Sequence, residues 1–120
     1  MYSPELIARW VGDFATSVEG QNRALQRNDA ATGNKYAKKY IAAVRKLREA
    51  GSAGWEALAL LLADSRIDVR TMAACFLLRY NPERAQAVLK ESALQKGVVG
   101  LGALMTLKRW EDGSWNLDQL

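Results

Sequence analysis

Apolar residues recur at intervals of three and four positions along almost the whole of this 120-residue chain. Such spacing forms one face of an α-helix, whereas a half-buried strand would place apolar residues at every second position, and no segment shows that alternation. Proline occurs twice, in Ser3-Pro4-Glu5 and Asn81-Pro82-Glu83, each time after a residue that can cap a helix. The sequence therefore predicts an all-α fold.

Six helical segments follow from this spacing. Their apolar stripes run through residues 3–18, 36–47, 52–62, 69–80, 82–93 and 101–110. Glycines stand where three of the helices end, at Gly51, Gly97 and Gly113, because glycine adopts the left-handed conformation that often terminates a helix. The fourth segment is apolar nearly all round, which predicts a helix in the middle of the packing.

The chain has the length of one domain, since domains usually hold roughly 100–200 residues. Its last four predicted helices form two pairs of about thirty residues each, and helix pairs of this size can stack so that each buries a face of its neighbour. We therefore predict a single helical-repeat domain over residues 1–120. It would be a short α-solenoid of about three helix pairs, followed by a tail over residues 113–120.

One segment, residues 58–74 with the sequence LALLLADSRIDVRTMAA, is similar to a HEAT repeat. That pattern has a leucine-rich helix, a turn containing aspartate, and then Val-Arg and Ala-Ala. The resemblance implies that Asp64 and Arg70 hydrogen-bond the turn backbone and each other, while the alanines let the helices approach closely. The first helix pair lacks this turn, and the last pair has glycines in its place.

The whole chain also resembles a small bacterial family of single-domain HEAT-like proteins of unknown function. The resemblance runs from Ser3-Pro4-Glu5 through Pro82-Glu83-Arg84-Ala85 to the segment Met105–Trp110. Some small HEAT-like bacterial proteins are immunity proteins that block a cognate toxin. The resemblance therefore implies a protein-binding role, with inhibition of a toxin as one form of it.

The composition argues against catalysis and against bound metals or cofactors. Histidine is absent and Cys75 is the one cysteine, which removes the usual nucleophile–histidine pairs and the common zinc sites. The adjacent acids Glu111 and Asp112 point to different sides of a helix and make a poor metal clamp. Cys75 lies among apolar residues, and we predict a buried, unreactive thiol. We predict no enzyme activity, no cofactor and no metal site.

Two further features bear on location. No apolar run approaches the roughly 18–20 residues that cross a bilayer, so we expect no membrane-spanning segment. The first residues lack a basic stretch followed by an apolar one, so we expect no secretory signal and a cytoplasmic protein.

A basic segment gives the first candidate binding surface. The net charge is +4, and a basic segment without any acid before Glu49 holds six cations, Lys35, Lys38, Lys39, Arg45, Lys46 and Arg48. On a helix, Lys35, Lys39 and Lys46 fall within about 40° of one another. They could bind phosphates or an acidic protein, with Tyr36 and Tyr40 at the edge of the face. Alternatively, they form an ordinary solvated helix side with both tyrosines at the margin of the core.

The tail gives the second candidate surface. Trp115 and two leucines follow the last helix, and they either cover the end of the stack or form an exposed docking element. The glycine-rich segment 97–102 matches no phosphate-binding fingerprint and is better explained as a turn.

Together these observations predict a non-enzymatic module that binds a protein partner, with an immunity-type inhibitor as its specific form. The alternative is nucleic-acid or phosphate binding by the basic helix face. The candidate binding residues are Lys35, Tyr36, Lys39, Tyr40, Lys46 and Trp115.

Overall fold

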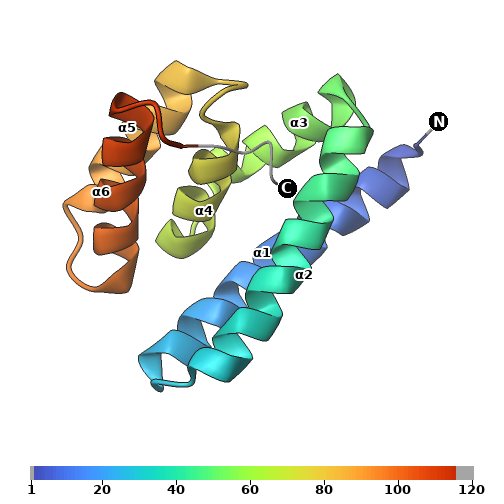
Figure 1. The fold of residues 1–120 in the computed structure, drawn as a ribbon. Helices are drawn as coiled ribbons and strands as arrows, with labels where there is room; N and C mark the ends of the chain where they lie inside the picture. Colours follow the sequence, from blue (N-terminus) through green and yellow to red (C-terminus); the bar gives the residue numbers. More distant parts are fainter. Residues whose placement is uncertain (1, 116–120) are drawn as a thin grey trace. The chain divides into compact units, whose positions relative to one another are not determined.

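The computed structural model describes residues 2–115, in which every regular element is a helix (Figure 1). The elements are α1 (Pro4–Gln26), α2 (Ala30–Glu49), α3 (Ser52–Ala59), the 3₁₀ helix η1 (Leu60–Ala63), α4 (Ile67–Leu77), α5 (Pro82–Ala93) and α6 (Val98–Glu111). The all-α prediction is thus confirmed for the described residues. Stacking of helix pairs into a HEAT-like solenoid stays a prediction. By its contacts the chain divides into two compact units, an N-terminal unit (Met1–Leu58) and a C-terminal unit (Ala59–Leu120).

The N-terminal unit is built on an antiparallel hairpin of α1 and α2 (Figure 1). The α1 helix begins as predicted, because the Ser3 hydroxyl accepts the Leu6 backbone N–H at 3.1 Å. Between the helices, Asn28 adopts a positive φ of 58°, and the Asp29 carboxylate accepts the Thr32 backbone N–H at 3.1 Å. This turn and cap direct α2 back along α1.

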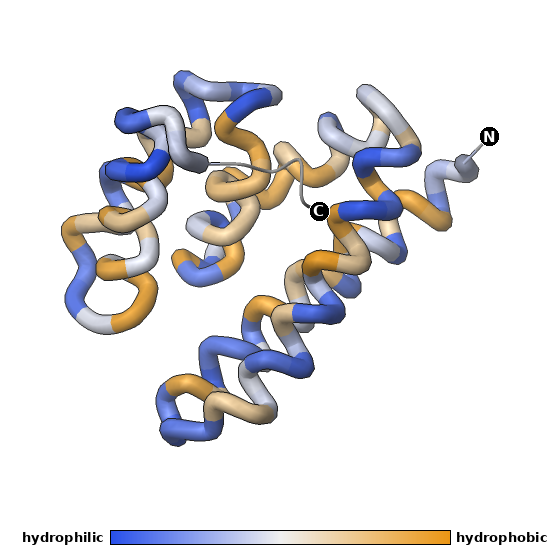
Figure 2. The backbone as a smooth tube through the Cα atoms, viewed as in Figure 1, coloured by the Kyte–Doolittle hydropathy of each residue, from blue (hydrophilic) through white to orange (hydrophobic). Residues whose placement is uncertain are grey.

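The seam of the hairpin is filled by the apolar faces of both helices. Phe14 is completely buried, and its ring meets the ring of Tyr40 edge to face with centroids 5.8 Å apart. Hydrophobic and hydrophilic residues follow one another at short intervals along both helices, as expected of helices with one buried side (Figure 2). Among the described residues, no helix combines the length and the apolar character that crossing a membrane requires.

In the C-terminal unit, α4 occupies the centre, as the sequence predicts. It packs against η1, α5 and α6, and most of its residues are buried. Small hydroxyl groups join the three helices inside this unit. The Thr71 and Ser92 hydroxyl oxygens lie 2.6 Å apart, and the Cys75 thiol donates to the Thr106 hydroxyl oxygen at 3.6 Å.

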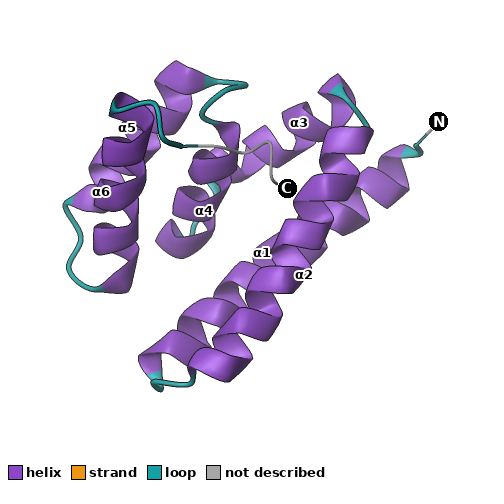
Figure 3. Ribbon diagram, viewed as in Figure 1, coloured by secondary structure: helices purple, strands orange, loops and turns teal. Residues whose placement is uncertain are grey.

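Several helix boundaries differ from the prediction (Figure 3). The predicted helix 52–62 ends as an α-helix at Ala59 and continues as the 3₁₀ turn η1, a frequent way for a helix to tighten before it ends. The predicted helix 69–80 is α4 and ends at Leu77. The chain then reaches Asn81, whose extended φ of −141° suits a residue before proline.

Two of the three glycines predicted to end helices do so, and one predicted cap is wrong. Gly51 and Gly113 follow the ends of α2 and α6 with positive φ of 72° and 79°. Gly97 also has a positive φ, of 88°, but it stands at the N-cap position of α6, after α5 has ended at Ala93. Asn81 precedes α5 at the N-cap position, but its side chain makes no capping hydrogen bond there. Pro82 at the first helical position lacks a backbone N–H, so the helix start has fewer donors to satisfy.

Candidate functional site

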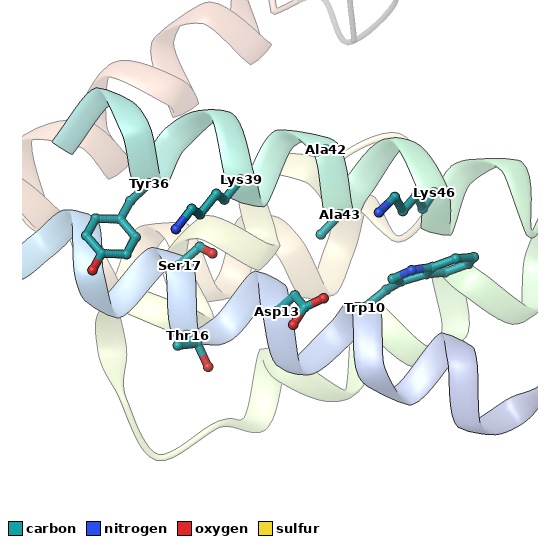
Figure 4. A pocket seen from close by; sticks show the side chains of 9 residues that line it. All are labelled: Trp10, Asp13, Thr16, Ser17, Tyr36, Lys39, Ala42, Ala43 and Lys46. Atoms are coloured by element: carbon teal, nitrogen blue, oxygen red, sulfur yellow. The ribbon is translucent and has the colours of Figure 1, made fainter. Parts of the chain in front are cut away.

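A groove of about 400 Å³ runs along the seam between α1 and α2, within the N-terminal unit (Figure 4). Its walls come from both helices. The lining residues are Trp10, Asp13, Thr16 and Ser17 from α1, and Tyr36, Lys39, Ala42, Ala43 and Lys46 from α2. Three of them, Tyr36, Lys39 and Lys46, belong to the binding surface predicted from the sequence.

The two lysines face the groove from the same side of α2 because seven residues make nearly two helical turns. Each ammonium group lies over an aromatic ring. Lys39 Nζ is 5.2 Å from the centre of the Tyr36 ring, and Lys46 Nζ is 5.9 Å from the Trp10 ring (Figure 4). Cations in these positions are attracted by the negative face of the ring. Both lysines are otherwise exposed, so their remaining N–H donors stay open to a ligand.

The aromatic walls are fixed by contacts of their own. Trp10 is 8% exposed, and the ring of Tyr2 meets it edge to face with centroids 5.4 Å apart. Tyr36 lies against Gly20 of α1, where an added Cβ atom would come within 2.5 Å of the tyrosine ring. A residue without a side chain at position 20 therefore lets the Tyr36 ring rest directly on the α1 backbone.

The α1 side of the groove is polar. Asp13 points into it between Trp10 and the hydroxyl-bearing residues Thr16 and Ser17 (Figure 4). The floor contributed by α2 consists of small apolar residues. The groove thus combines two cations, one carboxylate, two aliphatic hydroxyl groups and two aromatic walls, one of which carries the phenol of Tyr36.

The other predicted binding residues lie elsewhere. Lys35 is exposed on α2 but does not line the groove. Tyr40 is 7% exposed and belongs to the core, because its ring packs on Phe14. This placement agrees with the alternative prediction, in which the tyrosine packs at the margin of the core.

Trp115 fits the covering role better than the docking role predicted as its alternative. Its indole N–H donates to the Cys75 backbone carbonyl at 3.0 Å, which ties the end of the described chain to α4. The two leucines of the tail, at positions 117 and 120, lie outside the described residues.

The α1 groove residues were not predicted as binding residues, although a signal for them exists. Two pairs of residues that meet across the hairpin are equally far from Asn28 in sequence: Trp10 and Lys46 by eighteen residues, Gly20 and Tyr36 by eight. Once the turn is placed at Asn28, Trp10 follows as the residue of α1 opposite Lys46.

The hydrogen bonds predicted for the turn before α4 are present in part. Arg70 Nη1 donates to the backbone carbonyl oxygens of Asp64 at 2.8 Å and Ser65 at 3.2 Å. The Asp64 carboxylate accepts the backbone N–H of Arg66 at 3.0 Å. The predicted hydrogen bonds to the turn backbone are therefore present. The two residues contact each other through the Arg70 side chain and the Asp64 backbone carbonyl.

Two further observations concern metal ligands and the cysteine. No group of three or more histidine, cysteine or acidic side chains is placed to hold a metal ion in the part of the chain that the structure describes. Burial raises the pKa of the Cys75 thiol to about 11, so it stays protonated at neutral pH. The predicted burial of this cysteine is confirmed.

Comparisons with protein-family models, with curated proteins and with solved structures found no match to this chain. The resemblance to HEAT-like proteins therefore stands on the sequence segments that carry it.

Proposed function

We propose that the chain is a non-enzymatic protein-binding module, and that its groove between α1 and α2 holds an acidic segment of a partner protein. The observation that carries the proposal is the pair of lysines, Lys39 and Lys46, each over an aromatic wall of the same groove. An ammonium group held over a ring is partly positioned before a ligand arrives, so less side-chain entropy is lost on binding.

The spacing of the lysines suggests what the segment carries. Seven helical residues separate them by about 10 Å along the axis of α2. In a peptide with the polyproline II conformation, which has three residues per turn, side chains three residues apart lie on the same face and span about 9 Å. We therefore expect an acidic pair with two residues between its members, and a small or apolar side chain over the floor at Ala42 and Ala43. Asp13 would disfavour a third carboxylate next to it.

The same contacts favour a protein over the alternative, a nucleic acid. Proteins that bind single strands stack bases on open aromatic faces. Here Trp10 is almost fully buried between Tyr2 and Lys46, and the Tyr36 ring lies on Gly20 beneath Lys39. A base would have to displace a lysine to stack, and that would remove the cation which attracts the phosphates.

A peptide selection followed by two charge-matched variants tests the proposal. Random peptides displayed on phage are selected against the immobilised protein, and a selected peptide is then titrated by fluorescence anisotropy. We expect the selected sequences to be enriched in paired acidic residues. The double variant Lys39→Gln and Lys46→Gln should weaken binding about tenfold, since each exposed charge pair contributes roughly 0.2–1 kcal/mol.

The control is Lys38→Gln with Arg45→Gln. These exposed cations also lie seven residues apart on α2, and they do not line the groove. Each double variant removes two positive charges, so the net charge falls from +4 to +2 in both. Equal weakening in the two variants would mean that general attraction, not the groove, holds the peptide. Micromolar binding of a single-stranded RNA at about 150 mM salt, lost in the groove variant alone, would favour the nucleic-acid alternative.

A toxin as the partner is the specific form that the family resemblance suggests. It predicts that the neighbouring gene encodes a protein whose expression stops growth, and that co-expression of this chain restores growth. The groove variant should then fail to restore it while the control variant succeeds.

A further inference from the structure

The outer face of α6 is apolar, although it lies open at the surface of the C-terminal unit. The exposed large apolar side chains here are Val98, Leu101, Leu104 and Met105 on α6, together with Leu94 just before it. Leu101 is 60% exposed. From Val98 to Leu107 the helix carries no charged residue, and the hydrophobic colour is plain around the start of α6 (Figure 2).

The opposite face of α6 packs into the core of the C-terminal unit, so the outer face is not needed for that packing. Gly100, Ala103, Thr106 and Leu107 are the buried residues of this helix. A helix at a protein surface normally carries polar residues outward, and one that is apolar all round is normally covered. The exposed fractions leave on the order of 500 Å² open, which is near the upper end for the largest apolar patch of a monomer.

The pattern of side chains on this face is complementary to itself. Gly102 lies in its centre, and a Cβ atom added there would meet nothing within 4 Å. Val98, Leu101, Gly102 and Met105 are placed symmetrically about the point between Leu101 and Gly102. If a second α6 packs antiparallel across that point, Leu101 of each copy lies over Gly102 of the other, and Val98 lies against Met105.

We propose that the outer face of α6 is the interface of a homodimer, with a twofold axis between Leu101 and Gly102. Two such faces remove on the order of 1,000 Å² from water, which is the lower limit for a specific interface. The dimer should therefore be weak, with a dissociation constant in the micromolar range. The charged residues of α6 begin only at Lys108, beyond the symmetric stripe.

Sedimentation velocity on the full chain, from about 1 µM to about 1 mM, tests the proposal. The wild type should pass from monomer to dimer over this range, and Leu101→Glu should remain monomeric throughout. The matched control is Leu60→Glu, which places the same charge on another exposed leucine, 75% exposed in η1. The control should dimerise as the wild type does. A wild type that stays monomeric, or a Leu101→Glu variant that still dimerises, would overturn the proposal.

A second variant separates loss of the interface from loss of folding. Gly102→Gln fills the space that Leu101 of the partner would occupy, and glutamine favours a helix more than glycine does. We expect its thermal midpoint to be unchanged or higher while the dimer dissociates at least tenfold more readily. Dimerisation of Gly102→Gln at the wild-type concentration would refute the proposed placement of Leu101 over Gly102.

Discussion

Replacing Arg70 by alanine should destabilise the C-terminal unit by about 2 kcal/mol. Its guanidinium donates to two carbonyl oxygens of the turn before α4, at 2.8 and 3.2 Å. A hydrogen bond from a charged donor contributes about 1.5–3 kcal/mol when it is sheltered. The Arg70 side chain is 21% exposed and its hydrogen bond to Ser65 is open to solvent. Each of the two hydrogen bonds therefore contributes an energy at or below the lower end of that range. The carbonyl of Asp64, which is partly buried, would lose this donor.

The Arg70 side chain also lies 3.6 Å from the Glu91 carboxylate, and this contact needs a separate measurement. Glu91 is 64% exposed, and exposed pairs contribute roughly 0.2–1 kcal/mol. Glu91→Ala is therefore the control, with an expected loss well below that of Arg70→Ala. Arg70→Lys keeps the charge but lacks the planar fork that reaches two carbonyl groups, so it should fall between them.

Urea denaturation followed by far-UV circular dichroism measures all three variants. With a slope of about 1–3 kcal/mol per molar urea, a loss of 2 kcal/mol lowers the midpoint by about 1 M. If Arg70→Ala leaves the midpoint unchanged, the turn bonds contribute nothing and the HEAT-like motif is only a similarity of sequence. If Glu91→Ala lowers the midpoint as much as Arg70→Ala, the ion pair is the stabilising contact and the reasoning from the turn is wrong.

Three further predictions follow from local geometry. Gly12→Ala should raise the free energy of unfolding by about 0.5–1 kcal/mol, because the site is helical and has open space for a methyl group. Gly54→Ala should lower the free energy of unfolding, because the added Cβ atom would collide with a backbone carbonyl at the end of α2. Thermal melts compare the two variants. The hydrogen bonds from Thr32 lower the pKa of Asp29 in the folded protein below its unfolded value of 3.8. The stability that this cap contributes is therefore present above pH 3.8 and is lost as the pH falls through the folded pKa. A carbon-detected NMR titration of the Asp29 carboxyl group measures that pKa. Burial raises the pKa of the Cys75 thiol from 9.0 to about 11. The contribution of the buried thiol to stability is therefore complete below pH 9.0 and is lost as the pH rises towards 11. Ellman's reagent at pH 8 should label Cys75 in urea and leave it unlabelled in the folded protein.

Local signals were sufficient to predict most of the helices. Ser3 caps α1 through one hydrogen bond three residues away, and the positive φ at Gly51 and Gly113 is a property of those residues themselves. The buried stripe of a helix likewise depends only on its own spacing. Such features depend on neighbours in sequence, which is why the sequence contains them in full.

The groove could be predicted only on the α2 side. Lys39 and Lys46 share a helix face by spacing alone, but Trp10 and Asp13 join them through the register of the hairpin. That register depends on the turn at Asn28, a non-glycine residue with positive φ, which the spacing of residues within α2 does not contain.

The two tyrosines of α2 show the same limit within one helix. Tyr36 and Tyr40 both lie on its apolar stripe, four residues apart. Gly20 opposite Tyr36 leaves space for that ring at the rim, while Phe14 meets Tyr40 in the core. The different burial of the two tyrosines depends on residues of α1, so it cannot be read from the sequence pattern of α2 alone.

The two proposed surfaces differ in the physical force that would hold a partner, and salt separates them. Binding in the groove depends on the charges of Lys39 and Lys46, which are exposed and are screened as the Debye length falls from about 10 Å at 0.1 M to about 3 Å at 1 M salt. The α6 face carries no charge between Val98 and Leu107, so its association rests on apolar burial, which sulfate strengthens. Sodium sulfate should therefore weaken peptide binding and favour the dimer in the same sample. If both processes weakened together, the association would be electrostatic, and the α6 face could not be its interface.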